Sequence, residues 1–419
     1  MTKSLESFDF FDPSVLEDPF EFYEVLRREA PVHKVHHSGL GIDLYLVSTH
    51  ELVSQVMKND QLFSSNFSHL FFGGAHPEAE AILASGWPQV DTLITSDNPQ
   101  HARYRALVGR GFTPGRVSRM TAHIQQIIDD LIDEFIERGE CDFIADFAVK
   151  MPIYVIGDLL GLDRNEYMRL KTWSDAFLLR LSQMQSKEQD IESAKLIVDF
   201  QRHFFAMIES RRITPGDDLI TDLVNARIEG ERSLDTVEIL SIVQQVSVAG
   251  NESTRNTLIG GLGMLLQAPD QMEIVRRRPD IIGNAIDEII RLEVPTSGMW
   301  RIVRRDTELA GVRIPANAVI LVRLDAANRD PKQFPDPGRL DVLRRNAATH
   351  LSFGQGVHFC IGAMLARKEL TRAIPTILNR LRNLRIVAAR SDLTRTASLI
   401  HRAPRKLYLA FDPASRAAA

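Results

Sequence analysis

The sequence predicts a mainly α-helical fold with a small β region, arranged as one large domain. Apolar residues recur at helical spacing over most of the chain. Alternating or β-branched stretches that would form strands are few. The chain also lacks internal repeats and low-complexity linkers, so residues 1–410 are expected to form a single domain. Only residues 411–419 are expected to form a disordered tail.

The predicted elements follow from local patterns, taken in chain order. Residues 41–53 begin as a strand and become helical after Ser48-Thr49. Residues 123–138 predict a helix that ends at Gly139, because glycine readily adopts the left-handed conformation that follows many helices. Residues 307–324 predict two short strands around a turn at residues 315–317. The apolar face of the helix comprises Ile124, Ile127, Ile128, Leu131, Ile132 and Phe135.

The longest predicted helix runs from about Asp235 to about Ala268, a length of roughly 50 Å. Glu238 is spaced to form a capping box with Asp235. Weak helix formers and polar residues gather at mid-helix, in Val248 to Asn256, "VAGNESTRN". The pattern alone leaves two interpretations open: a satisfied polar patch at a helix–helix contact, or a functional site.

Composition limits the function classes that this chain can serve. The 419 residues carry a net charge of −5, which argues against non-specific nucleic-acid binding. Two cysteines can build neither a disulfide framework nor a four-cysteine zinc site, so a reducing, cytoplasmic setting is expected. The first residues show no signal-peptide pattern, and no apolar run is long enough to predict a membrane span.

Cys360 lies in a glycine-rich stretch, Leu351 to Leu370, "LSFGQGVHFCIGAMLARKEL". An amphipathic helix is predicted directly after it, kinked by Pro375, and the free N–H groups of a helix start stabilise a thiolate. Gly354 and Gly356 permit backbone conformations closed to other residues and a close approach of a flat ligand. A buried structural cysteine is the alternative interpretation of such a residue. Cys141 has no motif around it and is interpreted as structural.

The full spacing around Cys360 resembles the haem-binding motif of one family. The motif reads F-G-x-G-x-H-x-C-x-G. Six residues of this chain match it: Phe353, Gly354, Gly356, His358, Cys360 and Gly362. The chain is similar over nearly its whole length to soluble, bacterial-type cytochromes P450, which are haem-thiolate monooxygenases. The resemblance implies the cytochrome P450 fold as a single haem domain, with Cys360 as the axial thiolate of haem b.

Further motifs occur in the order that the family shows. Glu288 and Arg291, in "EIIR", are spaced to pair on one helix. The resemblance implies a buried structural network of this pair with Arg339, from "FPDPGRL". The segments "ANRDP" and "FPDP", within residues 327–337, support family membership and indicate little about the chemistry.

The resemblance also assigns residues to the haem. His101 and Arg105 lie one helical turn apart in "HARYR", and with His358 and Arg301 they match residues that bind the haem propionates. Solvated basic residues are the alternative interpretation. The remaining expected cofactor contacts are Phe353, Gly354, Gly362 and Ala249.

The mid-helix segment "AGNEST" matches the family's oxygen-activating segment, with one departure. Ala249, Gly250 and Glu252 fit the pattern, whereas Ser253 stands where threonine is usual, and Thr254 keeps a second hydroxyl. By resemblance, Gly250 leaves room for O₂ and a water. Ser253 or Thr254 would hydrogen-bond the oxygen, and Glu252 would connect the site to bulk protons.

The function implied is the oxidation of a hydrophobic small molecule with O₂ as co-substrate. The predicted haem domain accounts for nearly the whole chain, so no flavin or nicotinamide domain is expected, and electrons from NAD(P)H are expected through a [2Fe-2S]-type ferredoxin and its reductase. Candidate docking charges are Arg103, Arg110, Arg344, Arg345, Arg367 and Lys368. The substrate pocket is expected to use residues 67–93 and 173–181, with Val248, Ser297, Met299 and Phe177 as named contacts, although plain core packing is the alternative for each aromatic.

Other functions remain as alternatives at this point. A peroxide-driven peroxygenase of the same fold is the nearest one, although such enzymes usually lack the acid–alcohol pair that Glu252 and Ser253 provide. A haem-based sensor or carrier would need neither a proton relay nor a substrate pocket. A helical scaffold without a cofactor would explain none of the ordered motifs.

Overall fold

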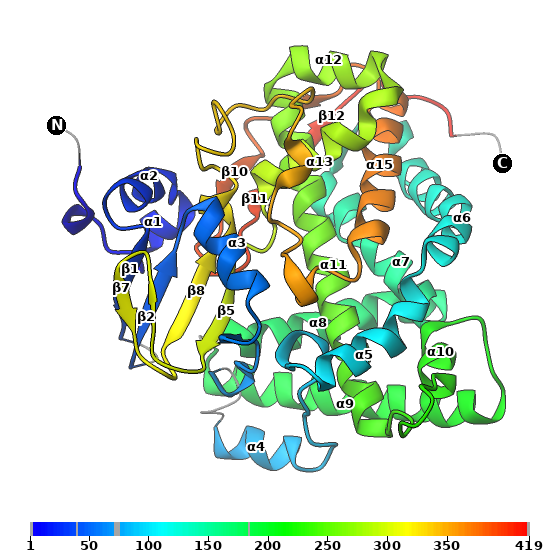
Figure 1. Ribbon diagram of the computed structural model, residues 1–419. Coiled ribbons are helices and arrows are strands. Elements are labelled where there is room, and N and C mark those ends of the chain that lie inside the picture. Colours follow the sequence, from blue (N-terminus) through cyan, green and yellow to red (C-terminus); the bar gives the residue numbers. More distant parts are fainter. Residues whose placement is uncertain (1–2, 39–40, 71–75, 183–184, 417–419) are drawn as a thin grey trace. The chain divides into compact units, whose positions relative to one another are not determined.

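The computed structural model describes residues 3–38, 41–70, 76–182 and 185–416. The chain divides into two compact units, and two of the boundaries fall inside helices α6 (Pro114–Asp133) and α11 (Thr236–Gln267). The β-containing unit comprises Met1–Ser64, Thr121–Val149 and Ser253–Ala419. The helical unit comprises Ser65–Met120 and Lys150–Glu252. Figure 1 shows the helices and strands with their labels.

The β-containing unit holds a mixed sheet of five strands in the order β1-β2-β8-β5-β3. Strands β2 and β8 pair in parallel, and the other neighbours pair antiparallel. These strands are β1 (Val32–His37), β2 (Ile42–Val47), β3 (Phe63–Ser64), β5 (Gly298–Val303) and β8 (Val319–Arg323). The smaller sheets are built from β4 (Glu140–Asp142), β12 (Tyr408–Ala410) and β9 (Arg385–Ile386), from β6 (Thr307–Leu309) and β7 (Val312–Ile314), and from β10 (Asp392–Arg395) and β11 (Pro404–Lys406).

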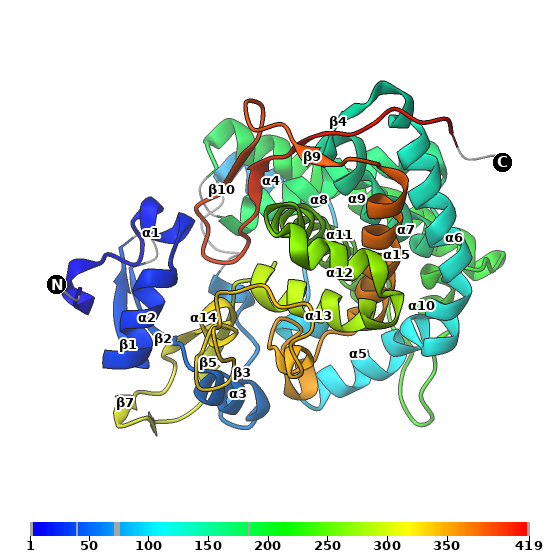
Figure 2. The same ribbon diagram turned by 90° about the horizontal axis from the view of Figure 1, so that it is seen from above.

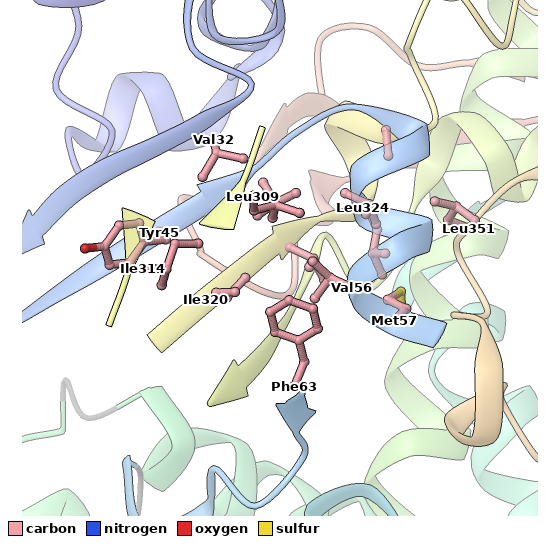
Figure 3. Packing of buried hydrophobic residues seen from close by; sticks show 14 of the residues in the cluster. Val32, Tyr45, Val56, Met57, Phe63, Leu309, Ile314, Ile320, Leu324 and Leu351 are labelled. Carbon is pink, nitrogen blue, oxygen red and sulfur yellow. The ribbon is translucent and has the colours of Figure 1, made fainter. Parts of the chain in front are cut away.

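A hydrophobic cluster joins this sheet to α3 and to the start of the cysteine loop. Met57 of α3, Ile320 of β8 and Leu351 all belong to it and are buried. Figure 3 shows these side chains gathered between the strands and the helix. The cluster therefore holds Leu351, the first residue of the loop that leads to Cys360, in place. The unit's remaining α-helices are α1 (Pro13–Glu17), α2 (Phe20–Glu29), α3 (His50–Lys58), α12 (Pro269–Arg277), α13 (Ile282–Glu293), α14 (Leu324–Ala327) and α15 (Ala363–Arg380).

The helical unit is built around aromatic side chains. Trp173 of α8 meets Phe200 of α9 edge to face at 5.6 Å, and both are fully buried. Such pairs add stability beyond the area that they bury. Its α-helices are α4 (Pro77–Leu83), α5 (Gln100–Val108), α7 (Lys150–Leu160), α8 (Tyr167–Ser182), α9 (Lys187–Ile213) and α10 (Leu219–Asn225). None of the described helices in either unit has both the length and the apolar composition that a membrane crossing requires.

Short 3-10 and π turns connect these elements. They are η1 (Leu5–Ser7), η2 (Ser68–Leu70), η3 (Leu93–Thr95), η4 (Gly109–Phe112), η5 (Ile136–Arg138), η6 (Ile144–Ala148), η7 (Arg164–Glu166), η8 (Pro279–Ile281), η9 (Ala347–Thr349) and η10 (Gly356–His358).

The long central helix agrees with its prediction. α11 has 32 residues, and the Asp235 and Glu238 side chains each accept a hydrogen bond from the other's backbone N–H at 2.9 Å. The strand-to-helix change after Ser48-Thr49 is also confirmed by β2 and α3. The expected helix over residues 123–138 is longer at its start and ends at Asp133, and Gly139 has a left-handed φ of 72°.

Two local predictions were wrong. Residues 307–324 form three strands, because Ala310 and Gly311 adopt positive φ values of 50° and 80° and turn β6 back onto β7. The expected tail over 411–419 is partly ordered. Phe411 is buried, its backbone N–H donates to the Gly139 carbonyl, and the backbone N–H of Asp412 donates to the Arg382 carbonyl. Residues 417–419 lie outside the described residues.

Candidate functional site

The cysteine loop is held by its own backbone. The Cys360 N–H donates to the Phe353 carbonyl at 2.8 Å, and the Gly354 N–H donates to the Leu351 carbonyl at 2.8 Å. The loop contains the short turn η10, and α15 begins just after it, at Ala363. The Cys360 thiol is exposed. A thiol that is exposed near a helix start is well placed to ionise and act as a ligand.

The cysteine loop passes so close to the end of α3 that it requires glycine at position 356. A side-chain carbon on Gly356 would lie 2.6 Å from the Met57 carbonyl oxygen and 3.1 Å from the Lys58 Cα, and the φ of Gly356 is 71°. Gly354 has a similar φ of 72°, but its nearest neighbour is the flexible end of Met57 at 3.0 Å. Backbone atoms cannot move aside as a methionine end can, so Gly356 is the more constrained of the two.

Asn328 connects the loop to helix α13. Its side-chain amide donates to the Arg291 carbonyl at 3.2 Å and to the Ser352 hydroxyl at 2.8 Å, and its oxygen accepts from the Leu351 N–H at 2.7 Å. Ser352 in turn donates to the Ile290 carbonyl at 2.8 Å. Asn328 belongs to the "ANRDP" segment, which the sequence interpretation treated as uninformative about chemistry. It is a positioning residue for the loop.

A buried charge network lies beneath this connection. Arg291 donates to both oxygens of Glu288, at 2.7 and 2.8 Å, and both side chains are fully buried. Arg344 donates to the same carboxylate at 3.0 and 3.1 Å. The guanidinium groups also donate to backbone carbonyls, Arg291 to Asn328 and Pro337, and Arg344 to Pro335 and Asp336.

The expectation that Arg339 completes this network was wrong. The Arg339 side chain is 63% exposed and pairs with Asp336 at 2.8 Å, so it contributes to the network only through its backbone carbonyl. Arg344 takes its place, five residues later. This finding also removes Arg344 from the candidate docking charges, because its side chain is only 7% exposed.

Arg367 is likewise committed to an internal contact. It donates to Asp287 of α13 at 2.7 Å and lies over the Phe353 ring at 4.6 Å. Burial raises the pKa of Asp287, but the neighbouring His350, whose Nε2 lies 3.6 Å away, and the hydrogen-bonded Arg367 outweigh it and hold that pKa below its usual range. Asp287 therefore stays ionised and fixes Arg367 against the loop.

The donor set of this unit fits a haem. Among the described residues, no group of three or more His, Cys, Asp or Glu side chains could hold a bare metal ion. A single thiolate suits an iron whose equatorial ligands come from a macrocycle. Arg301, buried on β5, and His358, half-buried on η10, provide cationic donors for propionates in the same unit.

Comparison with known proteins decides the family. A family model for cytochrome P450 matches residues 280–407. The steroid C26-monooxygenase of Mycobacterium tuberculosis is 36% identical over 374 residues, which cover 88% of each chain. The 6-deoxyerythronolide B hydroxylase of Saccharopolyspora erythraea is 35% identical over 92% of this chain and 94% of that protein. The chain is a cytochrome P450.

The fold agrees with this assignment. The crystal structure of P450BioI, in complex with an acyl carrier protein ligated to hexadec-9Z-enoic acid, matches with a TM-score of 0.86 and 28% identity. The match covers 96% of this chain and 99% of that one. The protein is therefore a bacterial-type cytochrome P450 monooxygenase, an oxidoreductase that uses haem and O₂.

The segment predicted to activate oxygen, residues 249–254, lies at the middle of α11. Glu252 and Ser253 are half-buried and Thr254 is buried, while Ala249 is exposed. The Thr257 hydroxyl donates to the Ser253 carbonyl at 2.8 Å, one turn along the helix. Because the Thr257 hydroxyl donates its hydrogen to this backbone carbonyl, it cannot donate the same hydrogen to another group.

Gly250 has a packing role in the helical unit, whereas the expectation that it leaves room for O₂ and a water stays a prediction. A side-chain carbon there would lie 2.5 Å from Ile156 Cδ1 of α7. Gly250 permits close packing of α7 on α11 in the helical unit.

The predicted propionate residues of the helical unit lie on α5. His101 is buried and Arg105 is half-buried, on successive turns. Tyr104, between them, donates to Glu238 at 2.9 Å, and burial together with this bond raises the pKa of Tyr104 to about 12. Arg103 pairs with Glu238 at 3.0 Å and is 9% exposed, which removes it from the candidate docking charges.

The predicted substrate contacts lie in different environments. Phe177 is buried and packs edge to face on Phe200 at 5.1 Å, as core packing would predict. Met299 packs against the core cluster of the β-containing unit, and Val248 is half-buried on α11. Ser297 is buried, and its hydroxyl has no hydrogen-bond partner among the described residues. Residues 71–75 of the expected pocket segment lie outside the described residues.

Cys141 is a structural cysteine. It is buried on β4, and burial raises the pKa of its thiol well above the ordinary value. A thiol that stays protonated is a poor nucleophile and a poor metal ligand.

Proposed function

We propose that this P450 hydroxylates, or otherwise oxidises, a hydrophobic small molecule in the cytoplasm. Its electrons would come from NAD(P)H through a [2Fe-2S]-type ferredoxin and a reductase. The observation that carries the proposal is that one chain contains both the cysteine loop and, on α11, an acid and two hydroxyls, Glu252, Ser253 and Thr254. Relatives named for a steroid and for 6-deoxyerythronolide B support a hydrophobic substrate.

Each group of this chain has a defined task. Haem, when bound, supplies the oxygen-activating chemistry. Cys360 would hold the haem iron through its thiolate, and His101, Arg105, Arg301 and His358 would supply the charges that bind the propionates. Ser253 or Thr254 offers a hydroxyl that hydrogen-bonds oxygen, and Glu252 passes protons to that hydroxyl from solvent.

Ferredoxin docking is proposed on the surface formed by the loop and the first turns of α15. Phe359 is 41% exposed and Met364 is 43% exposed, beside Lys368. They line a shallow hollow of about 390 Å³. Exposed apolar side chains next to a cation suit a transient partner with an acidic surface. Lys368 remains a candidate docking charge from the sequence, whereas Arg367 is paired with Asp287.

The first experiment is the difference spectrum of the dithionite-reduced protein with and without carbon monoxide. A strongly red-shifted Soret band is expected, because Cys360 would be a thiolate opposite the carbon monoxide. A band typical of histidine-ligated or thiol-protonated haem would overturn the role given to Cys360.

Turnover then distinguishes the monooxygenase from a peroxygenase. NADH with a surrogate ferredoxin and reductase should support oxidation of a hydrophobic substrate found by spin-state titration. Product formed with peroxide but not with NADH and the redox pair would favour the peroxygenase. Product with neither would favour a haem sensor or carrier.

A further inference from the structure

A second hollow, separate from the cysteine loop, lies between α12, η8 and α15. Its volume is about 370 Å³, within the range of small-ligand pockets. All of its lining residues belong to the β-containing unit. Figures 1 and 2 show α12 and α15 next to each other, from two directions.

The floor of this hollow is apolar. Val275 and Leu378 are buried there, and Ile282 and two prolines, Pro279 and Pro375, complete it. A ligand that covered this floor would remove apolar surface from water and gain binding free energy. The hollow therefore suits an occupant with an apolar part.

Its charged walls are entirely cationic. Arg276 comes from α12, and Lys368 and Arg372 come from α15. Across the described part of the chain, none of these three side chains forms an ion pair. Three neighbouring cations repel one another, so the hollow carries a local positive potential that an anion would neutralise.

Three carboxylates on the neighbouring elements do not neutralise these cations, because each pairs with a different arginine. Glu273 of α12 pairs with Arg277 at 2.5 Å, Asp280 of η8 with Arg278 at 2.7 Å, and Asp287 of α13 with Arg367 at 2.7 Å. Glu369 of α15 is fully buried, and burial raises its pKa well above the ordinary value. A raised pKa favours the neutral form of Glu369, which carries no charge.

Arg276 gives a second, independent indication of a ligand. Its Nε is buried and has no hydrogen-bond partner among the described residues. With no internal acceptor at Nε, the Arg276 guanidinium is not committed to another residue, and its charge stays available to an anion in the hollow that this residue lines.

We propose that this hollow, the α12–α15 pocket, binds a small organic anion. The ligand class is a carboxylate or phosphate monoester that also carries an apolar group. Arg276, Lys368 and Arg372 would hold the anionic group, and the floor of Val275 and Leu378 would receive the apolar part. Lys368 and Thr371 also line the docking hollow, so the two hollows adjoin along α15.

The test uses calorimetric titration of the haem-loaded protein with phenyl phosphate, inorganic phosphate and phenol. Phenyl phosphate should bind at one saturable site and more tightly than inorganic phosphate, and its affinity should fall with added salt. Phenol should bind far more weakly, because it lacks the anion. The Soret spectrum should not change during the titration, since the pocket is separate from the cysteine loop.

Matched variants locate the site. Arg276→Ala and Arg372→Ala, on different helices, should each weaken phenyl phosphate binding about tenfold. Arg277→Ala, the neighbouring exposed arginine already paired with Glu273, should leave it unchanged. The absence of saturable binding would overturn the proposal. Binding that is unchanged in both Arg276→Ala and Arg372→Ala would also overturn it. A Soret shift that follows the same titration curve as the binding heat would overturn it too, because the ligand would then bind near the haem.

Discussion

At the scale of single residues, the cysteine loop depends on Gly356 more than on its other glycines. Its positive φ and its 2.6 Å approach to a backbone oxygen of α3 are both properties that a side chain would disturb. Gly338 is exposed, has no positive φ and has no atom within 4 Å of an added carbon, so it provides a matched control.

Gly356→Ala should lower the free energy of unfolding by at least about 2 kcal/mol, because a left-handed alanine and a backbone clash both oppose the native loop. The variant should also show a weaker red-shifted Soret band in the carbon monoxide difference spectrum per mole of protein, because less of it would bind haem through Cys360. Urea unfolding and haem quantification check both effects. Gly338→Ala should change neither, and equal behaviour of the two variants would contradict the role given to Gly356.

The proton relay is tested at the same scale. Glu252→Gln should slow substrate oxidation about tenfold to a hundredfold, the range expected when an acid–base group is removed. Ser253→Ala should divert electrons to hydrogen peroxide, measured as peroxide formed per NADH consumed. Ser247→Ala is the control, because that hydroxyl donates to the Val243 carbonyl of its own helix at 2.7 Å. Wild-type rate and coupling in both relay variants would disprove the assignment.

At the scale of elements, α13 connects the haem-ligand loop to the segment that follows β8. Glu288 receives two guanidinium groups, and Asn328 links the end of the helix to Leu351 and Ser352. A buried carboxylate that loses one of its cations is left poorly compensated, which makes such networks sensitive to a single substitution.

Arg344→Ala should therefore destabilise the protein by about 3 kcal/mol. Arg345→Ala and Arg339→Ala should each cost less than about 0.5 kcal/mol, because both side chains are exposed. Urea unfolding of the three variants compares them directly. A larger cost for Arg339 than for Arg344 would restore the expectation drawn from the sequence.

Three helices of the helical unit meet at one buried carboxylate. Asp190 of α9 is fully buried, pairs with Arg180 of α8, and accepts from the His76 backbone at 2.9 Å, next to the start of α4. Burial alone would raise the pKa of Asp190, but its hydrogen bonds and Arg180 hold it below the ordinary value. The ionised form thus joins α4, α8 and α9.

Asp190→Asn should cost about 3 kcal/mol at neutral pH. Because the folded-state pKa is lowered, this contribution is present above about pH 4 and is lost as the pH falls below it. The difference from wild type, measured by urea unfolding, should hold from about pH 7 to pH 5 and shrink below about pH 4. Asp175→Asn, at an exposed pair with Lys171, is the control. A difference that grows as the pH falls below about 4 would contradict the assignment.

At the scale of the whole molecule, the net charge is −5, so long-range attraction cannot bring an acidic ferredoxin to the protein. Docking has to depend on a local surface, for which we propose Phe359, Met364 and Lys368. A charge introduced at the centre of that surface should change the rate at which ferredoxin associates with the protein, and should change the later steps of the reaction less.

Met364→Glu should slow ferredoxin-driven reduction about tenfold at low salt, whereas Met364→Lys should leave the rate equal or faster. The two variants remove the same apolar side chain and introduce charges of opposite sign. Stopped-flow reduction by ferredoxin measures the effect, and reduction by dithionite should be the same in both. Equal rates with ferredoxin for both variants would exclude this surface.

The sequence by itself determined the features that depend only on residues close together in the chain. The bounds of α11, the change from β2 to α3 and the motif that surrounds Cys360 each depend on neighbouring residues, whose spacing fixes their geometry. The same spacing was enough to indicate the family, which the comparisons then established.

Only the tertiary structure decided which distant residues meet. It chose Arg344 over Arg339 for Glu288, filled the space beside Gly250 with Ile156, and brought Arg276 to Lys368 and Arg372. Such contacts join segments that are far apart in the chain, and many alternatives have similar local energies. The native choice depends on the packing of whole helices, which no short stretch of sequence contains.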